Sequence, residues 1–587
     1  MVLFLLLPAA AQDGDGAEGG YEGGWRPGEP GGPSEKDKNK AKPKEPPKEE
    51  EPAADPFPDD EDGWGEEEAE APEAPSEPLP EGVDPVQAEF DRALAYQRKG
   101  KWTSAKRAFR KFLKHHPDHA LAALARERGG DNAFLGVEVI WESGPPARRI
   151  DVSVMGDGFT IDVSDQLMEK KWADLCLEVL WNEKVFEEYK SYFNYYFVRL
   201  ASLEEGVDPG LNPEELKKAQ ERNLRRRRAL NYKLDYSTAL DCKAAGPGGQ
   251  VMADPTLVYK WLDAAAKELP GCADDRFVIA FARFGILGMG GGGIANVGRP
   301  DKSITVHEFG HAFSRLLDEY AINPEAPQGA FGRAILAANA YASGPEPTPE
   351  EVPWAHMLKK RVKGVGIYEG GATFQKGVWR PAAGCAMNTG GNQFCPVCRE
   401  QTLLVIYEYV NPIDEASPDP SKTVETVAGS EDELLVLPMQ PEKHRLKARW
   451  HVGTLAVTTE SGPPAAPEAT TPFEGDPAPE APPDYPGMSN PFMGRRVQMP
   501  RDEYEQPPPG KLSPMGQKGR KRKDGACEYA FPIGKLPAGG YVITAEVWDD
   551  TEWVVKDDRH LLKERVSWQV RVAPPAKPEA AAPPKKR

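Results

Sequence analysis

Proline-rich stretches with almost nothing to bury divide this 587-residue chain and limit where it can fold. Residues 12–82 are first Gly-rich, then rich in Lys and Pro, and then rich in Glu, Asp and Pro; a second Pro-rich stretch covers about residues 462–520. Such compositions bury too little apolar surface to offset the entropy lost when a chain becomes ordered. We therefore predict disordered tails at 12–82 and 576–587 and a disordered insertion at about 462–520, with folded units between them.

Charge and apolar runs exclude two classes of protein. The formal net charge of −19 argues against a nucleic-acid binder, because phosphates are bound by a basic surface. The basic run KGRKRK at residues 518–523 is interpreted as a solvated charge run. No stretch reaches the roughly 20 apolar residues that a membrane-spanning helix needs.

The first residues, MVLFLLLPAAAQ, resemble the end of a secretory signal with an A-x-A cleavage site. The apolar run is short and no Lys or Arg precedes it. We therefore treat residues 1–11 as a truncated signal segment and expect the protein to be secreted or associated with the cell envelope.

Residues 83–130 carry two apolar stripes at helical spacing, separated by Gly100 and closed by Pro117. Within them, RKGKWTSAKRAFRKFLKHHPD resembles the second half of a tetratricopeptide repeat (TPR). Only one copy is visible, and such repeats need stacked neighbours to bury their faces. We therefore predict a single TPR-like helical hairpin rather than a peptide-binding solenoid.

The next two units differ in their apolar pattern. Residues 131–411 mix strand-like alternation, as at 150–154, with helical patterns between 163 and 202, which predicts an α+β domain. Residues 412–575 alternate as half-buried strands do, for example in LKARWHVGTLAVT and GYVITAEVWDDTEWV. We predict an immunoglobulin-like β-sandwich there, interrupted by the Pro-rich insertion.

The segment VHEFGHAFSRLLDEY at residues 306–320 contains two histidines four residues apart. On a helix, His307 and His311 lie on one face and can both reach one ion, with Glu308 beside the first. In this H-E-x-x-H arrangement the histidines bind zinc and the glutamate takes a proton from the zinc-bound water. The alternative is a surface helix with two ordinary histidines.

Several carboxylates could supply a third ligand. Asp318 follows the second histidine by seven residues, so an unbroken helix would place it about 10 Å further along the axis. The helix must therefore end or bend after about Phe313. In metzincin-type peptidases a glycine makes that bend and the third ligand follows three residues later; here Ser314 takes the place of the glycine, and the acidic residue comes one position late. Asp318 is the first choice, and Glu319 and Glu369 remain open.

As a whole, HEFGHAFSRLLDEY resembles the active-site helix of the IgA peptidase family of zinc metallopeptidases, which carries H-E-x-G-H followed by Asp-Glu-Tyr. Further stretches resemble the family in order: GDGFT at 156–160, TALDC at 238–242, the glycine cluster before the helix, IYEGGATFQKGVWRP and CAMNTGGNQFCPVC. The resemblance covers roughly residues 150–410, with Glu369-Gly370-Gly371 in place of Glu-Gly-Ala. It implies a zincin-like domain at 131–411 that binds Zn²⁺ and uses Glu308 as general base.

Two further residues receive roles in this interpretation. Met387, in GCAMNTG, lies downstream of the helix as the methionine of a Met-turn would, and the alternative is an ordinary core methionine. Tyr320 is expected to support the oxyanion. An extended substrate is expected to add to an edge strand near Phe277–Gly285 by main-chain hydrogen bonds.

The seven cysteines leave two possibilities open. Cys385, Cys395 and Cys398 could hold a second, structural zinc, although a fourth ligand is not obvious. In an exported protein, Cys385 could instead form a disulfide with either of the other two, and Cys242 with Cys272 is another candidate pair.

Together these features predict an exported zinc-dependent endopeptidase acting on protein or peptide substrates, with attachment to a cell surface through its flanking modules. The rival is an exported, surface-associated binding protein that keeps an inactive peptidase fold as a scaffold. The intact set of His307, Glu308 and His311 argues against the rival, because a scaffold gains nothing from a metal-bound water beside a base.

Overall fold

The structure is a computed structural model that describes residues 84–98, 102–129, 132–210, 236–245, 250–283, 287–300, 304–324, 336–343, 345–388, 393–455 and 510–575, with single residues 214, 217, 218, 391 and 508 between them. These residues belong to one compact unit. The predicted signal segment, both predicted tails and the Pro-rich insertion up to residue 507 lie outside the described residues. Within the described ranges, no helix has the length and apolar character needed to cross a membrane.

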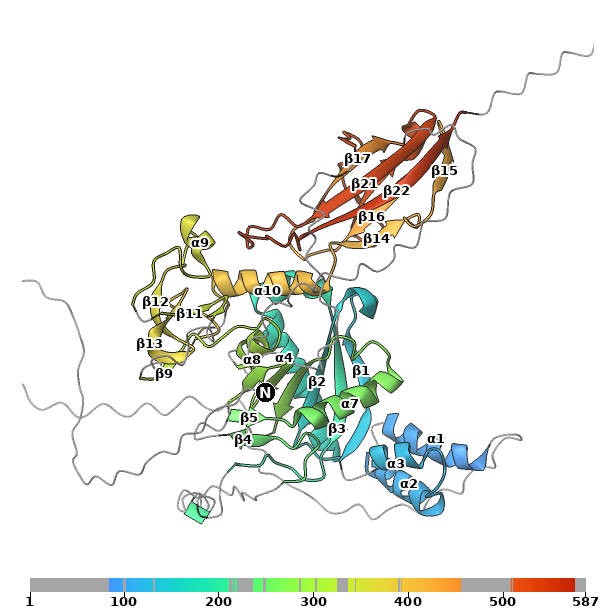
Figure 1. The fold of residues 1–587 in the computed structure, drawn as a ribbon. Helices are drawn as coiled ribbons and strands as arrows, with labels where there is room; N and C mark the ends of the chain where they lie inside the picture. Colours follow the sequence, from blue (N-terminus) through green and yellow to red (C-terminus); the bar gives the residue numbers. More distant parts are fainter. Residues whose placement is uncertain are drawn as a thin grey trace, which may run out of the picture. The chain divides into compact units, whose positions relative to one another are not determined.

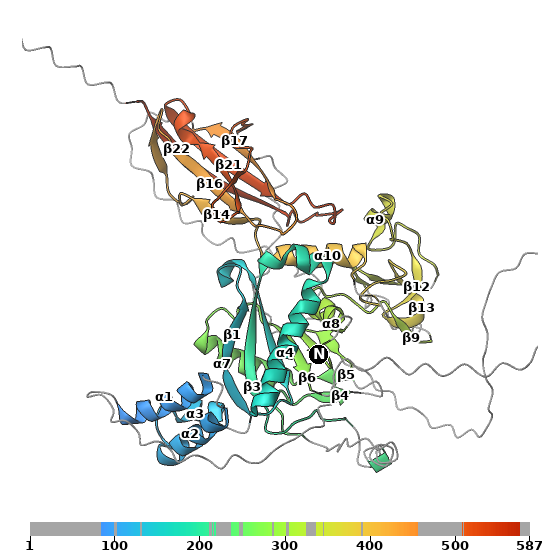
Figure 2. The same cartoon turned by 180° about the vertical axis from the view of Figure 1, so that it is seen from behind.

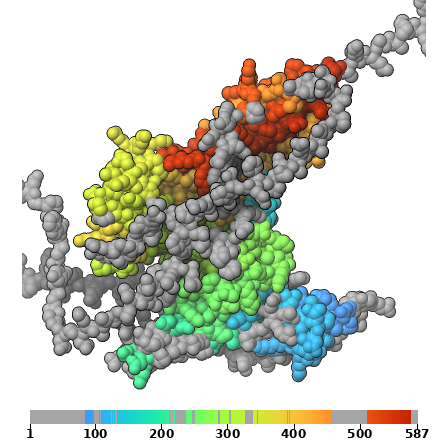
Figure 3. Space-filling view, in the orientation of Figure 1, coloured from blue at the N-terminus to red at the C-terminus, as the bar shows by residue number. Residues whose placement is uncertain are grey.

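The N-terminal unit consists of three helices, coloured blue in Figures 1 and 3. Phe90 of the first packs edge-to-face against Phe109 and Phe112 of the second, with ring centroids 5.5 Å apart in both pairs. The third helix contributes Ala122 and Ala125 to the buried surface. The helices are α1 (Pro85–Arg98), α2 (Trp102–His115) and α3 (Ala122–Gly129). The predicted hairpin is therefore followed by a third helix, and the TPR-like interpretation stays a prediction.

A six-stranded sheet forms the centre of the next unit, in the order β1-β3-β2-β6-β8-β7. Its inner strands are parallel, and the outer pairs β1/β3 and β7/β8 are antiparallel. Strands buried on both faces read as continuous apolar runs, which the residues of β6 illustrate. The strands are β1 (Ala133–Trp141), β2 (Ile150–Asp157), β3 (Phe193–Ala201), β6 (Phe277–Ala282), β7 (Met289–Gly291) and β8 (Ile294–Val297).

Helices cover both faces of this sheet. Side chains of α7 (Pro255–Glu268) pack on one face in one buried cluster, and those of α4 (Val163–Trp181) and α8 (Ile304–Ala312) pack on the other face in a second cluster. Figures 1 and 2 show α4 and α7 on opposite sides of the strands. A mixed sheet with helices on both faces is consistent with the predicted combination of helices and strands.

The expectation of a substrate-binding edge near Phe277–Gly285 is wrong. Strand β6 lies between β2 and β8, and all six of its residues are buried. A strand that is paired on both sides has no open edge. The last strand on this side of the sheet is β7, which the glycine cluster itself forms.

Short elements surround the sheet. The region after α8 forms a five-stranded sheet, and one long helix follows it. The elements are α5 (Lys184–Glu188), β4 (Lys243–Ala245), β5 (Gln250–Met252), β9 (Ala321–Asn323), β10 (Leu336–Ala337), β11 (Ala340–Ala342), α9 (Ala355–Lys359), β12 (Tyr368–Gly371), β13 (Thr373–Arg380), α10 (Pro396–Tyr409) and the 3-10 turns Pro146–Arg148 and Lys190–Tyr192.

The GDGFT and TALDC motifs meet at one carboxylate. Asp157, fully buried at the end of β2, accepts hydrogen bonds from Thr238 Oγ1 at 2.8 Å and from the backbone N–H groups of Leu240 at 2.8 Å and Cys242 at 2.9 Å. Ser202 Oγ donates to the same carboxylate at 3.3 Å. The first motif therefore fixes the second, which is separated from it by about 80 residues.

The C-terminal unit consists of two sheets, in the orders β14-β16-β20-β19 and β15-β22-β21-β17-β18. Trp450 of the second sheet packs on Phe531 of the first, with ring centroids 5.3 Å apart. The strands are β14 (Ile413–Ser417), β15 (Val424–Val427), β16 (Glu433–Pro438), β17 (Lys447–Thr454), β18 (Lys511–Leu512), β19 (Arg520–Lys521), β20 (Cys527–Pro532), β21 (Gly539–Trp548) and β22 (Lys563–Ala573), with a 3-10 turn at Ile533–Lys535. The immunoglobulin-like assignment stays a prediction.

A buried polar network joins the C-terminal strands to the residues of the preceding unit. Asp549 accepts hydrogen bonds from the hydroxyls of Tyr189 at 2.6 Å and Tyr407 at 2.7 Å. His444 lies between two carboxylates, with Nε2 2.9 Å from Asp549 and Nδ1 2.7 Å from Glu188. Both ring nitrogens face acceptors, so the protonated imidazole satisfies the site best.

Candidate metal centre

The helix that carries the histidine pair ends near Phe313, as Asp318 would require in order to reach the histidines. Helix α8 stops at Ala312, and the chain then turns, with the N–H groups of Ser314 and Leu316 both donating to the carbonyl oxygen of Gly310. Arg315 takes the left-handed conformation, with φ of 59°. The turning residue therefore comes one position after Ser314, and Asp318 follows it by three residues. Compared with the metzincin pattern, both the turning residue and the acidic residue are shifted by one position toward the C-terminus, so the spacing between them is kept.

Three side chains converge at this bend. Asp318 Oδ1 lies 2.9 Å from His307 Nε2 and 3.0 Å from His311 Nε2, and the two Nε2 atoms lie 3.1 Å apart. Each Nδ1 faces a backbone carbonyl oxygen, that of Ala386 at 2.9 Å and that of Leu316 at 2.6 Å. A carbonyl can only accept, so each Nδ1 carries a proton, which leaves Nε2 of each ring as the atom available to bind a metal ion. Two imidazole Nε2 atoms and a carboxylate oxygen this close to one another could hold a shared cation.

Glu308 is held beside this group by glycines. Its side chain is 6% exposed, and a Cβ added at Gly288 would lie 2.5 Å from its Cγ. A Cβ added at Gly290 would lie 2.8 Å from the Cβ of His311, and the Gly290 N–H donates to the Glu308 carboxylate. Burial raises the pKa of Glu308, although the two histidines partly offset this effect. The glycine cluster therefore lets β7 approach α8 closely, a role that sequence reasoning missed although the cluster itself was visible.

Met387 and Tyr320 both lie beside the candidate metal ligands. Met387 is fully buried, and its sulfur would lie 2.7 Å from a Cβ added at Gly310, which stands between the two histidines on α8. The ring of Tyr320 stacks on that of His307, with centroids 5.9 Å apart and planes 23° apart. Burial, and then the negative charge of Asp318, raise the pKa of Tyr320. Both residues lie beside the candidate ligands, and their expected roles stay predictions.

The other two candidate carboxylates lie elsewhere. Glu319 is fully buried but lies beside three cysteines rather than the histidines. Glu369 is exposed on β12, and it belongs to no group of potential metal ligands among the described residues. Asp318 is therefore the carboxylate that the fold places with His307 and His311.

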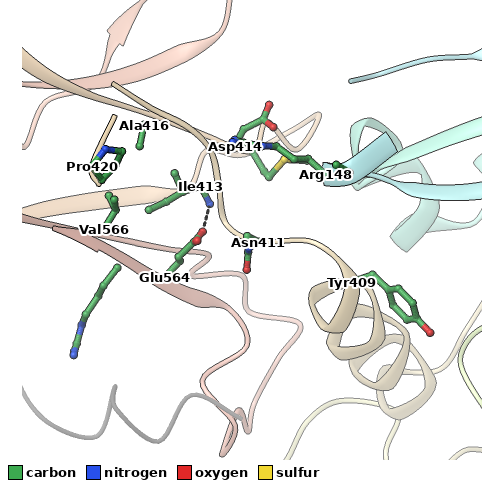
Figure 4. A pocket seen from close by; sticks show the side chains of 12 residues that line it. Arg148, Tyr409, Asn411, Ile413, Asp414, Ala416, Pro420, Glu564 and Val566 are labelled. Atoms are coloured by element: carbon green, nitrogen blue, oxygen red, sulfur yellow. Dashed lines mark hydrogen bonds between the residues drawn. The ribbon is translucent and has the colours of Figure 1, made fainter. Parts of the chain in front are cut away.

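A pocket of about 370 Å³ lies apart from these residues (Figure 4). In it, Glu564 accepts a hydrogen bond from the Ile413 N–H at 2.7 Å. Its lining residues are Ala147, Arg148, Tyr409, Asn411, Ile413, Asp414, Ala416, Pro420, Met439, Glu564, Arg565 and Val566. None of the candidate metal ligands lines this pocket, so it is separate from the candidate metal centre.

Comparison with known proteins supports a peptidase. The family model described as IgA Peptidase M64 matches residues 138–219. The match begins in β1, includes β2, α4 and β3, and ends before α8, so it supports this peptidase family without covering the histidine pair. Peptidases of this family are metallopeptidases, which agrees with a fold that has groups able to hold an ion. No curated protein matches the chain.

Proposed function

We propose that this chain is an exported zinc-dependent endopeptidase. The observation that carries the proposal is the convergence of His307, His311 and Asp318 at the end of α8, with Glu308 beside them. Two imidazole nitrogens and one carboxylate oxygen leave one position of a tetrahedral ion open, which is typical of catalytic rather than structural zinc. The family match independently supports peptide hydrolysis.

Each neighbouring side chain has a role in such a reaction. Zinc at this site would lower the pKa of a bound water and polarise the scissile carbonyl. Glu308 accepts a proton from the attacking water and later donates a proton to the leaving amine, and its buried position, which raises its pKa, favours this exchange. Tyr320 donates a hydrogen bond toward the developing oxyanion. Met387 packs against Gly310 of α8 and provides an apolar surface next to the two histidines.

We propose that an extended substrate lies along β7 rather than β6. Strand β7 is the last of the sheet and runs directly beside Glu308 and His311. A Cβ added at Gly291 would meet no atom of the described residues within 4 Å, so these residues leave the space beside it open. Main-chain hydrogen bonds to an edge strand bind extended peptides with little dependence on sequence. Export and attachment to a cell surface through the flanking modules belong to the same proposal.

Zinc content and cleavage of an unstructured protein, measured together, test the proposal. The purified chain should bind zinc and cleave, whereas Glu308→Gln should bind zinc equally and lose at least about 10²-fold in cleavage rate, since it loses its general base. Glu178→Gln, a matched change at an exposed position of α4, should cleave normally. Zinc binding without cleavage by the unaltered chain, across a broad substrate panel, would favour the inactive scaffold instead.

A further inference from the structure

A second group of potential metal ligands lies next to the first and takes no part in the proposed reaction. Glu319 directly follows Asp318 in the chain. Cys385 comes from the loop before Met387, and Cys395 and Cys398 come from the start of α10, where Cys395 is the N-cap. Each of the four offers a ligand atom, and these atoms all lie within 4.8 Å of one another.

The distances within this Cys₃Glu cluster suit a tetrahedral ion. Ligands bound to zinc at about 2.0–2.3 Å lie roughly 3.5–3.8 Å from one another. Glu319 Oε1 lies 3.0 Å from Cys398 Sγ and 3.7 Å from Cys395 Sγ. Small movements would therefore bring these atoms into coordination. Three sulfur ligands also favour zinc over magnesium or calcium, which prefer oxygen.

The buried Glu319 has an oxygen without a hydrogen-bond partner among the described residues, which favours a cation at this point. All four side chains are buried, with exposures between 0% and 5%. Glu319 Oε2 has no hydrogen-bond partner among the described residues, and Oε1 receives a long bond from Asn339 Nδ2 at 3.3 Å. A buried carboxylate without compensation is costly, and coordination of a metal ion is one of the established ways to offset the cost.

The backbone around the cysteines is arranged as it would be around thiolates. The Cys395 N–H points to Cys385 Sγ at 3.2 Å, and the Cys398 N–H points to Cys395 Sγ at 3.5 Å. The cluster also lies at the N-terminus of the 14-residue helix α10, where the helix dipole stabilises negative charge. Thiolate, not thiol, is the form that binds metal.

A disulfide satisfies the same residues less well. It would join two of the three sulfurs and leave the third beside Glu319, whose Oε2 has no hydrogen-bond partner among the described residues. All seven cysteines of the chain are free thiols in the structure, including Cys242 and Cys272, the other candidate pair. An ion uses all three sulfurs and the carboxylate together.

We propose that Glu319, Cys385, Cys395 and Cys398 hold a structural zinc ion. The ion would tie the turn after α8 to the loop that carries Ala386 and Met387 and to the start of α10. The Glu319 N–H already donates to the Met387 carbonyl at 2.6 Å, so the two segments are in contact. Because Asp318 and Glu319 are adjacent, the structural ion would hold Asp318 in place for the histidines, which makes the cluster a positioning device for the catalytic centre.

The experiment uses the full chain carrying His307→Ala and His311→Ala, in which the proposed catalytic centre is removed. This variant should keep one equivalent of zinc of the two expected in the unaltered chain. After exchange of zinc for Co²⁺, it should show sulfur-to-cobalt charge-transfer absorption. Adding Cys395→Ser and Cys398→Ser should remove both signals, and Cys527→Ser, which alters a cysteine outside the cluster, should leave both unchanged.

Thiol titration of the denatured chain with a chelator distinguishes the other outcomes. Seven reactive thiols are expected, because the chain contains seven free cysteines. Two fewer would show a disulfide, and seven thiols with no charge-transfer absorption in the His307→Ala, His311→Ala chain would show a metal-free cluster. Either result would overturn the proposal, and neither depends on whether the chain cleaves peptides.

Discussion

Asp318 reaches the two histidines because of one residue with an unusual backbone. Arg315 has a positive φ, which costs a side-chain-bearing residue roughly 1–2 kcal/mol. Part of that cost is offset because the Arg315 guanidinium donates to the buried carboxylate of Glu408 at 2.8 Å. The ion pair therefore supports the bend that brings Asp318 to His307 and His311.

Replacing Asp318 should weaken zinc binding strongly. Asp318→Ala removes one of the three converging candidate ligand atoms. Loss of a residue that only hydrogen-bonds a metal ligand lowers metal affinity by up to about 100-fold, so loss of a ligand itself should lower zinc affinity by more than about 100-fold. Zinc affinity is measured by competition with a chelating dye. Glu369→Ala is the matched control, because Glu369 is exposed on β12 and should not change the affinity. A larger loss at Glu369 than at Asp318 would show that the ligand assignment is wrong.

Among single residues, the sequence predicted the arrangement of those that are close together in the chain. Two histidines four residues apart on a helix must share a face, whatever the rest of the fold does. The position of Asp318 depends instead on a left-handed arginine, for which no sequence signal exists. The carbonyl groups of Ala386 and Leu316 that orient the histidines are backbone atoms and carry no residue-type signal at all.

Among the elements, the turn after α8 is fixed by the side chain of Ser314. Ser314 is fully buried, and the Thr402 hydroxyl of α10 donates to its Oγ at 2.8 Å. This contact pins the end of α8 against α10. Ser314 takes the place of the metzincin glycine, and it is held by a side-chain contact that glycine cannot make.

Ser314→Gly should therefore destabilise the protein, even though metzincin-type peptidases carry a glycine at the corresponding place. We expect a loss of about 1–2 kcal/mol in the free energy of unfolding, from one hydrogen bond and the greater freedom of glycine. Ser314→Ala removes only the hydrogen bond and should cost less. Both are measured by chemical denaturation; a Ser314→Gly protein more stable than the unaltered chain would contradict the assigned role of Arg315 as the turning residue.

Asp157→Asn should loosen the junction between the GDGFT and TALDC motifs. The amide would place an N–H₂ group against donors that now point to a carboxylate, which we expect to cost about 3 kcal/mol. Thermal denaturation should show a lower midpoint. Asp162→Asn, at an exposed position five residues later, should change little. An Asp157→Asn protein as stable as the unaltered chain would show that the buried carboxylate is not important for stability.

The strands show why element type was easier to predict than element placement. A strand was expected near Phe277–Gly285, and the structure has β6 there, although it is buried rather than at an edge. Its place in the middle of the sheet follows from pairing with β2 and β8, which are separated from it in the chain. The glycines of β7 carry no strand signal of their own, and they form a strand by pairing with β8 while they lie close to α8.

Across the whole molecule, buried polar contacts link segments that the sequence places far apart. Tyr189 and Asp549 are separated by 360 residues, yet their side chains share a hydrogen bond of 2.6 Å. Arg149 likewise donates to both carboxylate oxygens of Asp414, at 2.8 and 2.9 Å. Linear patterns predicted separate units but could not show that Asp549 and His444, which lie next to C-terminal strands, share buried contacts with Glu188 of α5 and Tyr407 of α10.

His444 gives this network a dependence on pH whose sign can be worked out. Burial lowers its pKa, but Asp549 and Glu188 outweigh that effect and raise the pKa to about 9. The unfolded value is about 6.5. A pKa that is raised on folding contributes stability that is fully present below about pH 6.5 and is lost as the pH rises through 9.

We expect the temperature of the unfolding midpoint to decrease as the pH rises from about 6.5 to about 9. His444 should lose about 2 kcal/mol of stabilising free energy over this range, a modest amount because the imidazole is partly exposed to solvent. His444→Gln cannot be protonated, so it should be less stable than the unaltered chain at about pH 6.5 and should show a flatter dependence on pH. Other groups titrate in the same range, so the decisive quantity is the difference in slope between the two proteins. His115→Gln, which alters an exposed histidine of α2, should keep the slope of the unaltered chain. If His444→Gln keeps it as well, the imidazole does not link the C-terminal strands to Glu188 through its charge.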